Sequence, residues 1–177
     1  LDIQYGRDGL VVDNRLRTTA PGVHAAGDCI PGPQLAHVAY VEAEVAVENA
    51  LRGTGKGVSY EHIPRCIFTR PPIAFLGVGE AEARRRGLDF NVSVFPYLAN
   101  GRALAHGDGE GRGFAKLIHE PALGRVIGAV LVGPEATEMV GTLSALVSAE
   151  GTVEELARAI MPHPTFSETL KEAALQA

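Results

Sequence analysis

The chain has 177 residues, of which 46% are hydrophobic and 21% charged, and its formal net charge is −5. This composition is typical of a globular protein, and the length allows one good core or two small ones. No run approaches the ~20 apolar residues of a membrane span, and no signal peptide is recognisable, so we expect a cytoplasmic protein without a membrane partner. Lysines and arginines are scattered rather than gathered in a basic stripe, which argues against a nucleic-acid partner.

The two cysteines, Cys29 and Cys66, match neither the spacing of zinc ligands nor that of a Cys-x-x-Cys redox pair. We therefore expect no metal site and two buried, reduced thiols. The chain opens at Leu1 without an initiator methionine and reads at once like the interior of a domain. We expect it to be a fragment of a longer protein.

The first third of the chain predicts two short strands and a helix. Residues 10–12 follow a turn signal and predict the first strand. Residues 23–26 predict a second, buried strand, which ends at Asp28. Residues 35–51 carry apolar side chains at helical spacing, and Gly53 stops the helix.

Asp28 and the start of this helix form a candidate binding site. In open α/β sheets, ligands bind outside the carboxyl ends of the strands. There Asp28 can accept hydrogen bonds from sugar-like hydroxyl groups, and the amides of residues 34–37 can face a negative or electron-rich group. A Gly-Asp turn before a helix also occurs without any ligand, so this pattern alone leaves both interpretations open.

The remaining two thirds predict a separate α+β domain. Residues 53–57 are rich in glycine, and we place the domain boundary there, with domains over 1–55 and 60–177. Strands are expected at 66–68, 73–76, 92–95, 113–119 and 125–132, the last three as an antiparallel meander. Helices are expected at 80–87 and 135–150, and after capping boxes that begin at Thr152 and Thr165.

His163 stands between two prolines, and Glu168 follows five residues later. A proline pushes the residue before it out of the helical region, so His163 is held extended. Glu168 fits equally well as the carboxylate of the capping box begun by Thr165, and His163 as a histidine that merely bonds backbone. A catalytic and a purely structural pair are therefore both open, although we do not expect one carboxylate rotamer to serve both.

Five motifs, taken together, resemble the carboxyl-terminal part of the pyridine nucleotide-disulfide oxidoreductases. They occur in the order of that family, across essentially the whole chain, and are TAPGVHAAGD (19–28), GPQLAH (32–37), TRPPI (69–73), GVGE (77–80) and HPTFSE (163–168). Within the family, the chain is most similar to the dihydrolipoamide dehydrogenases, with the glutathione reductases next.

The resemblance implies an FAD site in the first domain and a dimer interface in the second. Residues 1–55 would be the closing piece of an FAD-binding α/β domain, and residues 60–177 the interface domain of a homodimer. Asp28 would bind the ribityl chain. The isoalloxazine ring would be contacted by Gln34, Leu35, Ala36 and His37.

The resemblance also implies an acid/base pair, in which His163 serves the flavin and disulfide of the partner subunit. A thiol becomes a thiolate before it attacks a disulfide, and an imidazole can take that proton and later return it. Glu168 would hold the ring, as the carboxylate does in hydrolase triads. The substrate would be a dithiol or disulfide such as lipoamide. A cis His163–Pro164 bond is a further implication.

Parts of such an enzyme are missing from this sequence. It contains neither a Gly-x-Gly-x-x-Gly motif for FAD or NAD(P) nor a Cys-x4-Cys redox pair. We therefore expect an incomplete FAD site, an NAD(P) site in the missing part, and no activity of the fragment alone. A glutathione-reductase-like or other disulfide reductase, and a non-catalytic dimerisation module, remain alternatives. His106 and His119 are expected at the surface, in or beside loops.

Overall fold

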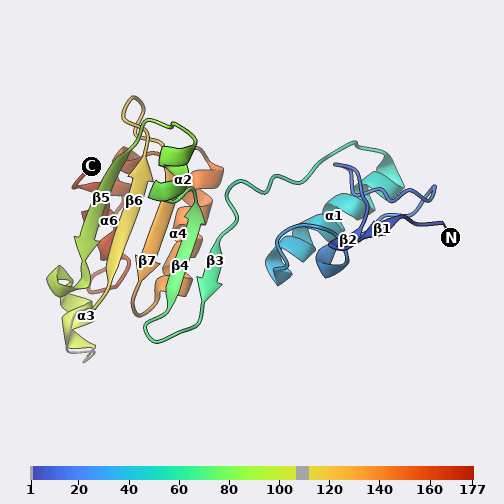
Figure 1. Cartoon of the computed structure of the whole chain (residues 1–177). Coiled ribbons are helices and arrows are strands. Elements are labelled where there is room, and N and C mark those ends of the chain that lie inside the picture. The colour runs from blue at the N-terminus through green and yellow to red at the C-terminus, as the bar shows by residue number, and fades with distance from the viewer. Residues whose placement is uncertain (1, 107–111) are drawn as a thin grey trace. The chain divides into compact units, whose positions relative to one another are not determined.

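The computed structural model describes residues 2–106 and 112–177, and its contacts divide the chain into two compact units, Leu1–Tyr60 and Glu61–Ala177 (Figure 1). Their assignment as an FAD-binding piece and an interface domain stays a prediction. No helix in the described ranges is both long enough and apolar enough to cross a membrane.

The first unit consists of a small hairpin, a short turn of 3-10 helix and one long α-helix. Strands β1 (Tyr5–Gly6) and β2 (Gly9–Leu10) pair antiparallel, and η1 (Gly27–Cys29) precedes α1 (Ala36–Arg52). Helix α1 ends at Gly53, whose φ of 61° is the left-handed conformation that glycine adopts without strain. The predicted helix and its stop signal are confirmed.

The predicted buried strand at residues 23–26 is wrong. Only His24 forms a β-bridge there, with Arg17, and the amide of Ala25 donates to the Leu16 carbonyl at 3.0 Å. The chain turns back at once between these segments, so the run meets a single short stretch of backbone instead of a continuous partner strand. Asp28 accordingly lies in the 3-10 turn η1 and not at the end of a strand. The strand expected at 10–12 is likewise reduced to its first residue and a bridge from Val12.

The buried face of α1 also differs from the prediction. Val41 and Leu51, which belong to the expected apolar stripe, are 48% and 80% exposed, whereas Glu42 and Asn49 are buried. The apolar core of this unit is small and is formed by Leu16, Ala25, Ile30 and Ala46, with Leu10, Val12, Val45 and Val58 packed against it. Polar side chains therefore occupy part of the interior.

The second unit is the α+β arrangement that the sequence predicts. Its sheet consists of β3 (Arg65–Ile67), β4 (Ile73–Gly77), β5 (Asn91–Pro96), β6 (Phe114–His119) and β7 (Val126–Val132). All pairings are antiparallel, in the order β3-β4-β7-β6-β5, so the predicted meander is present as β5-β6-β7. The helices are α2 (Glu80–Arg85), α3 (Gly101–Ala105), α4 (Ala136–Ser148), α5 (Val153–Arg158) and α6 (Glu168–Ala174). Helix α3 and the 3-10 turn η2 (Tyr97–Ala99) were not predicted.

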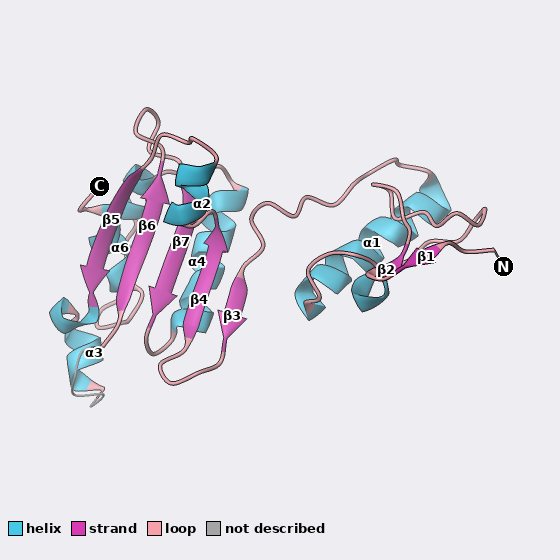
Figure 2. Ribbon diagram, in the orientation of Figure 1, coloured by secondary structure: helices cyan, strands magenta, loops and turns pink. Residues whose placement is uncertain are grey.

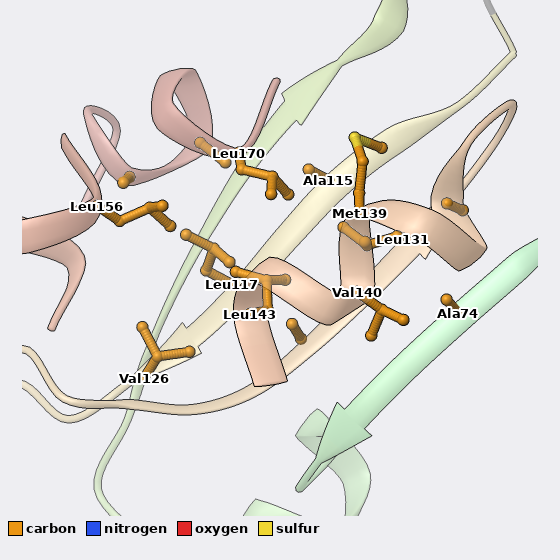
Figure 3. Packing of buried hydrophobic residues seen from close by; sticks show 14 of the residues in the cluster. Ala74, Ala115, Leu117, Val126, Leu131, Met139, Val140, Leu143, Leu156 and Leu170 are labelled. Carbon is orange, nitrogen blue, oxygen red and sulfur yellow. The ribbon is translucent and has the colours of Figure 1, made fainter. Parts of the chain in front are cut away.

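Helices α4 and α6 lie on one face of this sheet, behind it in Figure 2. Helix α4 packs on β4 and β7, and α6 packs on β5 and β6. Figure 3 shows Leu143 of α4 and Leu170 of α6 pointing into the layer between helices and sheet, where Leu117 and Leu131 meet them; all four are fully buried. Burial of such a side chain stabilises the fold by about 1.5–3 kcal/mol.

Two glycines allow β4 and β7 to meet closely. Gly77 pairs with Gly128, and a Cβ on Gly128 would lie 2.0 Å from the carbonyl oxygen of Val78. No larger residue fits there without moving backbone. The glycine of the GVGE motif thus has a packing reason in this sheet.

The two histidines that were expected at the surface, His106 and His119, differ in exposure. His106 is exposed, as predicted, whereas His119 is only 3% exposed, so its predicted surface position is wrong. His119 ends β6 beside a register shift after Ile118, and both residues are buried there. Burial lowers the pKa of His119.

Candidate functional site

The loop between α5 and α6 brings His163 and Glu168 together. His163 Nδ1 lies 2.8 Å from Glu168 Oε1. The histidine side chain is 77% exposed and the glutamate side chain 26%, so the ring points outward while the carboxylate is half-buried against the fold. The His163–Pro164 peptide bond is cis, as the resemblance implied.

The second carboxylate oxygen of Glu168 is also used. The amide of Thr165 donates to Glu168 Oε2 at 2.8 Å, while the Thr165 hydroxyl donates to the Pro162 carbonyl at 2.7 Å. The predicted capping box is therefore wrong in one half, because the threonine hydroxyl does not cap α6. One rotamer of Glu168 makes both contacts, contrary to expectation, because each contact takes its own oxygen; the catalytic role of the pair stays a prediction. The box predicted at Thr152, with Glu155, is complete.

These bonds favour the ionised form of Glu168 and determine the tautomer of a neutral His163 ring. The Thr165 amide and, second, the His163 ring lower the pKa of Glu168. A carboxylate can only accept hydrogen bonds, so Nδ1 of a neutral His163 ring carries the proton. The lone pair of the neutral imidazole is then on Nε2, the nitrogen that does not face the carboxylate. The arrangement can accept a proton at Nε2 and stabilise the resulting cation.

An aromatic cluster anchors the loop that carries His163. Phe166 is buried, with its ring centroid 5.6 Å from that of Tyr97 and 5.6 Å from that of His106. Such tilted and edge-on pairs favour fixed ring positions. The hydroxyl of Tyr97 donates to the Pro134 carbonyl at 2.9 Å, so the cluster is tied to the start of α4.

Asn100 is a supporting residue that the sequence analysis missed. Its side-chain amide donates to the Thr165 carbonyl at 3.1 Å and to the Thr169 hydroxyl at 2.9 Å, and its carbonyl oxygen accepts from the Ala103 amide at 2.9 Å. The side chain thus caps α3 and holds both ends of the segment that contains Glu168. The capping role has a local signal in the sequence, whereas a contact across more than sixty residues has none.

A second group of predicted residues surrounds η1 in the first unit. Asp28 and Gln34 line one open hollow of about 660 Å³, together with Arg7, Asp8, Gly9, Ile30, Pro31 and Gly32. Leu35 is the N-cap residue of α1, and no side chain caps this end of the helix. Ala36 and His37 form the first turn of α1. The structure therefore places Asp28 and Gln34 in one hollow and the other three residues in the adjoining helix start.

Glu42 was also missed, although the sequence contains a signal for it. The carboxylate is only 2% exposed and accepts hydrogen bonds from the Gly27 amide at 2.6 Å and from the Tyr60 hydroxyl at 2.8 Å. The buried residues of α1 are Val38, Glu42, Ala46 and Asn49, which recur at strict helical spacing. That spacing places Glu42 and Asn49 on the inner face of α1, whereas the prediction had an apolar stripe there.

The cysteines do not form a redox pair in this chain. Both are free thiols; Cys29 is exposed and Cys66 half-buried, so the expectation of two buried thiols is wrong. Burial raises the pKa of Cys66. In the parts of the chain that the structure describes, no three His, Cys, Asp or Glu side chains gather to hold a metal ion.

Comparison with known proteins identifies two family models. Residues 63–174 match the model of the pyridine nucleotide-disulphide oxidoreductase dimerisation domain, and residues 1–43 match a second model of pyridine nucleotide-disulphide oxidoreductases. The dihydrolipoyl dehydrogenases of Bacillus subtilis and Geobacillus stearothermophilus are 37% and 41% identical, each over 98% of this chain and 37% of the relative.

Similar solved structures support the same family assignment. The crystal structure of LpdA from Mycobacterium tuberculosis superposes with a TM-score of 0.89 at 33% identity, covering 99% of this chain and 38% of that one. The HOCl-induced flavoprotein disulfide reductase RclA from Escherichia coli has a TM-score of 0.89 at 31% identity, covering 98% of this chain and 40% of RclA. The chain thus spans less than half the length of these relatives.

Proposed function

The chain belongs to the pyridine nucleotide-disulphide oxidoreductase family, and from that premise we propose that it supplies the carboxyl-terminal part of an FAD-dependent NAD(P)-disulfide oxidoreductase of the dihydrolipoyl dehydrogenase type. The observation that carries the proposal is the 2.8 Å contact between His163 Nδ1 and Glu168 Oε1 on an exposed ring. The substrate is a dithiol or its disulfide, such as dihydrolipoamide.

In this proposal His163 is the acid/base residue. Nε2 takes the proton of a substrate thiol, and the thiolate attacks a sulfur of the redox disulfide, forming a mixed disulfide and releasing the other sulfur as a thiolate. Glu168 stabilises the imidazolium and keeps the ring in place. The given residues contain no Cys-x4-Cys pair, and in this proposal the partner subunit supplies the redox disulfide.

The first unit is proposed to hold part of FAD. When bound, FAD carries two electrons between the dithiol and the nicotinamide. The exposed carboxylate of Asp28 can accept hydrogen bonds from the ribityl hydroxyls, and it lines the same hollow as Gln34. Leu35, Ala36 and His37 supply the amide end of α1 toward the isoalloxazine ring. These residues fit the hydroxyl groups of a polyhydroxylated chain and the hydrogen-bond acceptors of the ring.

The second unit is proposed to form the homodimer. Its match to a dimerisation-domain model covers residues 63–174. Gly141, Ala145 and Ser148 lie exposed along α4, and small side chains let a second helix approach closely. Because this sequence contains neither the redox pair nor the nucleotide-binding glycine motifs, we expect the chain alone to be inactive.

The test is a substitution of His163 in the full-length enzyme. We expect His163→Gln to lower kcat for dihydrolipoamide by about 10²–10⁴-fold, since this is what a positioned general base contributes. His62→Gln, at another exposed histidine of the second unit, is the matched control and should keep wild-type turnover. Full turnover of His163→Gln would contradict the proposal.

A disulfide reductase with a substrate other than lipoamide is the second candidate function, because the chain is 31% identical to the disulfide reductase RclA. Parallel assays with dihydrolipoamide and glutathione disulfide distinguish these substrates. A protein that dimerises but reduces neither, with FAD bound or added, would leave only a dimerisation module.

A further inference from the structure

Glu42 is a buried carboxylate whose two oxygens reach opposite parts of the first unit. Oε2 accepts from the Gly27 amide at 2.6 Å, and Oε1 accepts from the Tyr60 hydroxyl at 2.8 Å. The residue is 2% exposed, and none of the salt bridges among the described residues includes it. Burial of such a group is costly unless hydrogen bonds compensate it, so these two contacts determine its position.

The bond to Gly27 fixes the turn that presents Asp28. Gly27 is the first residue of this turn, with φ of 78°, and a Cβ built on it would lie 3.4 Å from the Cβ of Ala39 on α1. On the other side, a Cβ on Gly9 would lie 2.5 Å from the carbonyl oxygen of Cys29. The turn is thus held between α1 and the hairpin, and Glu42 provides the side-chain hydrogen bond on the α1 side.

The bond to Tyr60 reaches the end of the first unit. Tyr60 is its last residue and closes the segment that leads from α1 toward the second unit. Burial and, second, the hydrogen bond to Glu42 raise the pKa of Tyr60 to about 12, so the phenol remains a hydrogen-bond donor at neutral pH. The same carboxylate therefore contacts the Asp28 turn and the end of the linker.

We propose that Glu42 is a positioning residue for FAD, and that the Tyr60 hydroxyl holds its carboxylate in place, so that the linker and the Asp28 turn are coupled through one side chain. This inference rests on the proposed function, since it requires Asp28 to bind FAD. It adds two residues, neither of which contacts the cofactor hollow, to those that determine flavin affinity.

The experiment measures the Kd of FAD for the flavin-free full-length enzyme, by quenching of flavin fluorescence. Tyr60→Phe should raise this Kd by roughly three- to tenfold, the value of one lost hydrogen bond. Glu42→Leu should raise it further, and Tyr60→Phe should have no additional effect in that background. Glu42→Gln should retain near wild-type affinity, because a carboxamide can accept from the Gly27 amide and donate to the Tyr60 oxygen.

Tyr40→Phe is the matched control, since Tyr40 lies on the same helix and is 71% exposed. Additive effects of the Tyr60 and Glu42 substitutions would overturn the inference. An unchanged Kd in Tyr60→Phe would overturn it by itself, even if Glu42→Leu failed to fold. If the wild-type enzyme and Tyr40→Phe bind no FAD, the proposed function itself fails, which is a different result.

Discussion

The two units are stabilised by different kinds of interaction. In the second unit, the interior between sheet and helices is built from a large set of buried apolar side chains, among them Leu117, Leu143 and Leu170. In the first unit, the apolar core is small, and Glu42 and Asn49 occupy buried positions on α1. The proposed acid/base loop therefore lies on packed apolar layers, whereas the proposed flavin-binding turn depends on a few hydrogen bonds.

The largest effect expected from this comparison is at Leu143. This side chain is fully buried, and Leu143→Ala should lower the free energy of unfolding of the second unit by about 2–5 kcal/mol, through lost burial and a residual cavity. Chemical denaturation followed by circular dichroism measures it. Leu123→Ala, at a leucine that is 67% exposed, is the control and should change stability by no more than about 0.5 kcal/mol. Equal losses of stability in Leu143→Ala and Leu123→Ala would contradict the view that buried apolar side chains stabilise the second unit.

A smaller effect is expected at Asn49. Its amide donates to the carbonyls of Arg15 and Lys56, and its carbonyl oxygen accepts from the Thr54 hydroxyl and the Lys56 amide. Asn49→Ala leaves these groups unpaired and should cost about 1–3 kcal/mol in the first unit only. Hydrogen exchange at the amide of Lys56 should accelerate, while exchange in β6 and β7 should not.

The matched variant for this prediction is Asn49→Asp, which keeps the two accepted hydrogen bonds and loses the two donated ones. We expect its effect to be intermediate. If exchange at Lys56 is as slow in Asn49→Ala as in the wild type, hydrogen bonds do not hold this unit in the way that the comparison requires.

The smallest effect is the pH dependence of the His163 loop. The pKa of Glu168 is lowered in the folded protein, so its ionised form contributes stability above the ordinary carboxyl pKa of 4.5, and this contribution is lost as the pH falls through the folded value. Glu168→Gln should therefore reduce protection of the Thr165 amide at neutral pH and lose little further protection in acid. An identical acid profile in wild type and variant would contradict this.

The sequence predicted the second unit better than the first because apolar periodicity carries the signal. Apolar runs joined by glycine-rich turns located the strands of the meander, and helical spacing located α4. On α1 the same rule located the helix but misassigned its inner face, since Glu42 and Asn49 are polar. The strand predicted at 23–26 is wrong because a short apolar run does not indicate whether a partner strand is available to pair with it.

For the candidate sites, locality decided what could be predicted. His163 stands between two prolines and Glu168 follows five residues later, so both were candidates from a local pattern, and the family resemblance implied their contact. Asn100 reaches Thr165 from a distant part of the sequence, and Glu42 reaches Tyr60 from another element. Such contacts depend on the tertiary fold, and local patterns do not encode them.

The division of the Glu168 carboxylate has a consequence for repeated cycles of reaction. One oxygen faces the Nδ1 side of the imidazole, and the other remains bonded to the Thr165 amide. A proton gained or lost at Nε2 breaks neither bond, so the loop has no reorganisation to undergo between the two charge states. If His163 is the acid/base residue proposed above, it is preorganised for both directions of proton transfer by the same two hydrogen bonds.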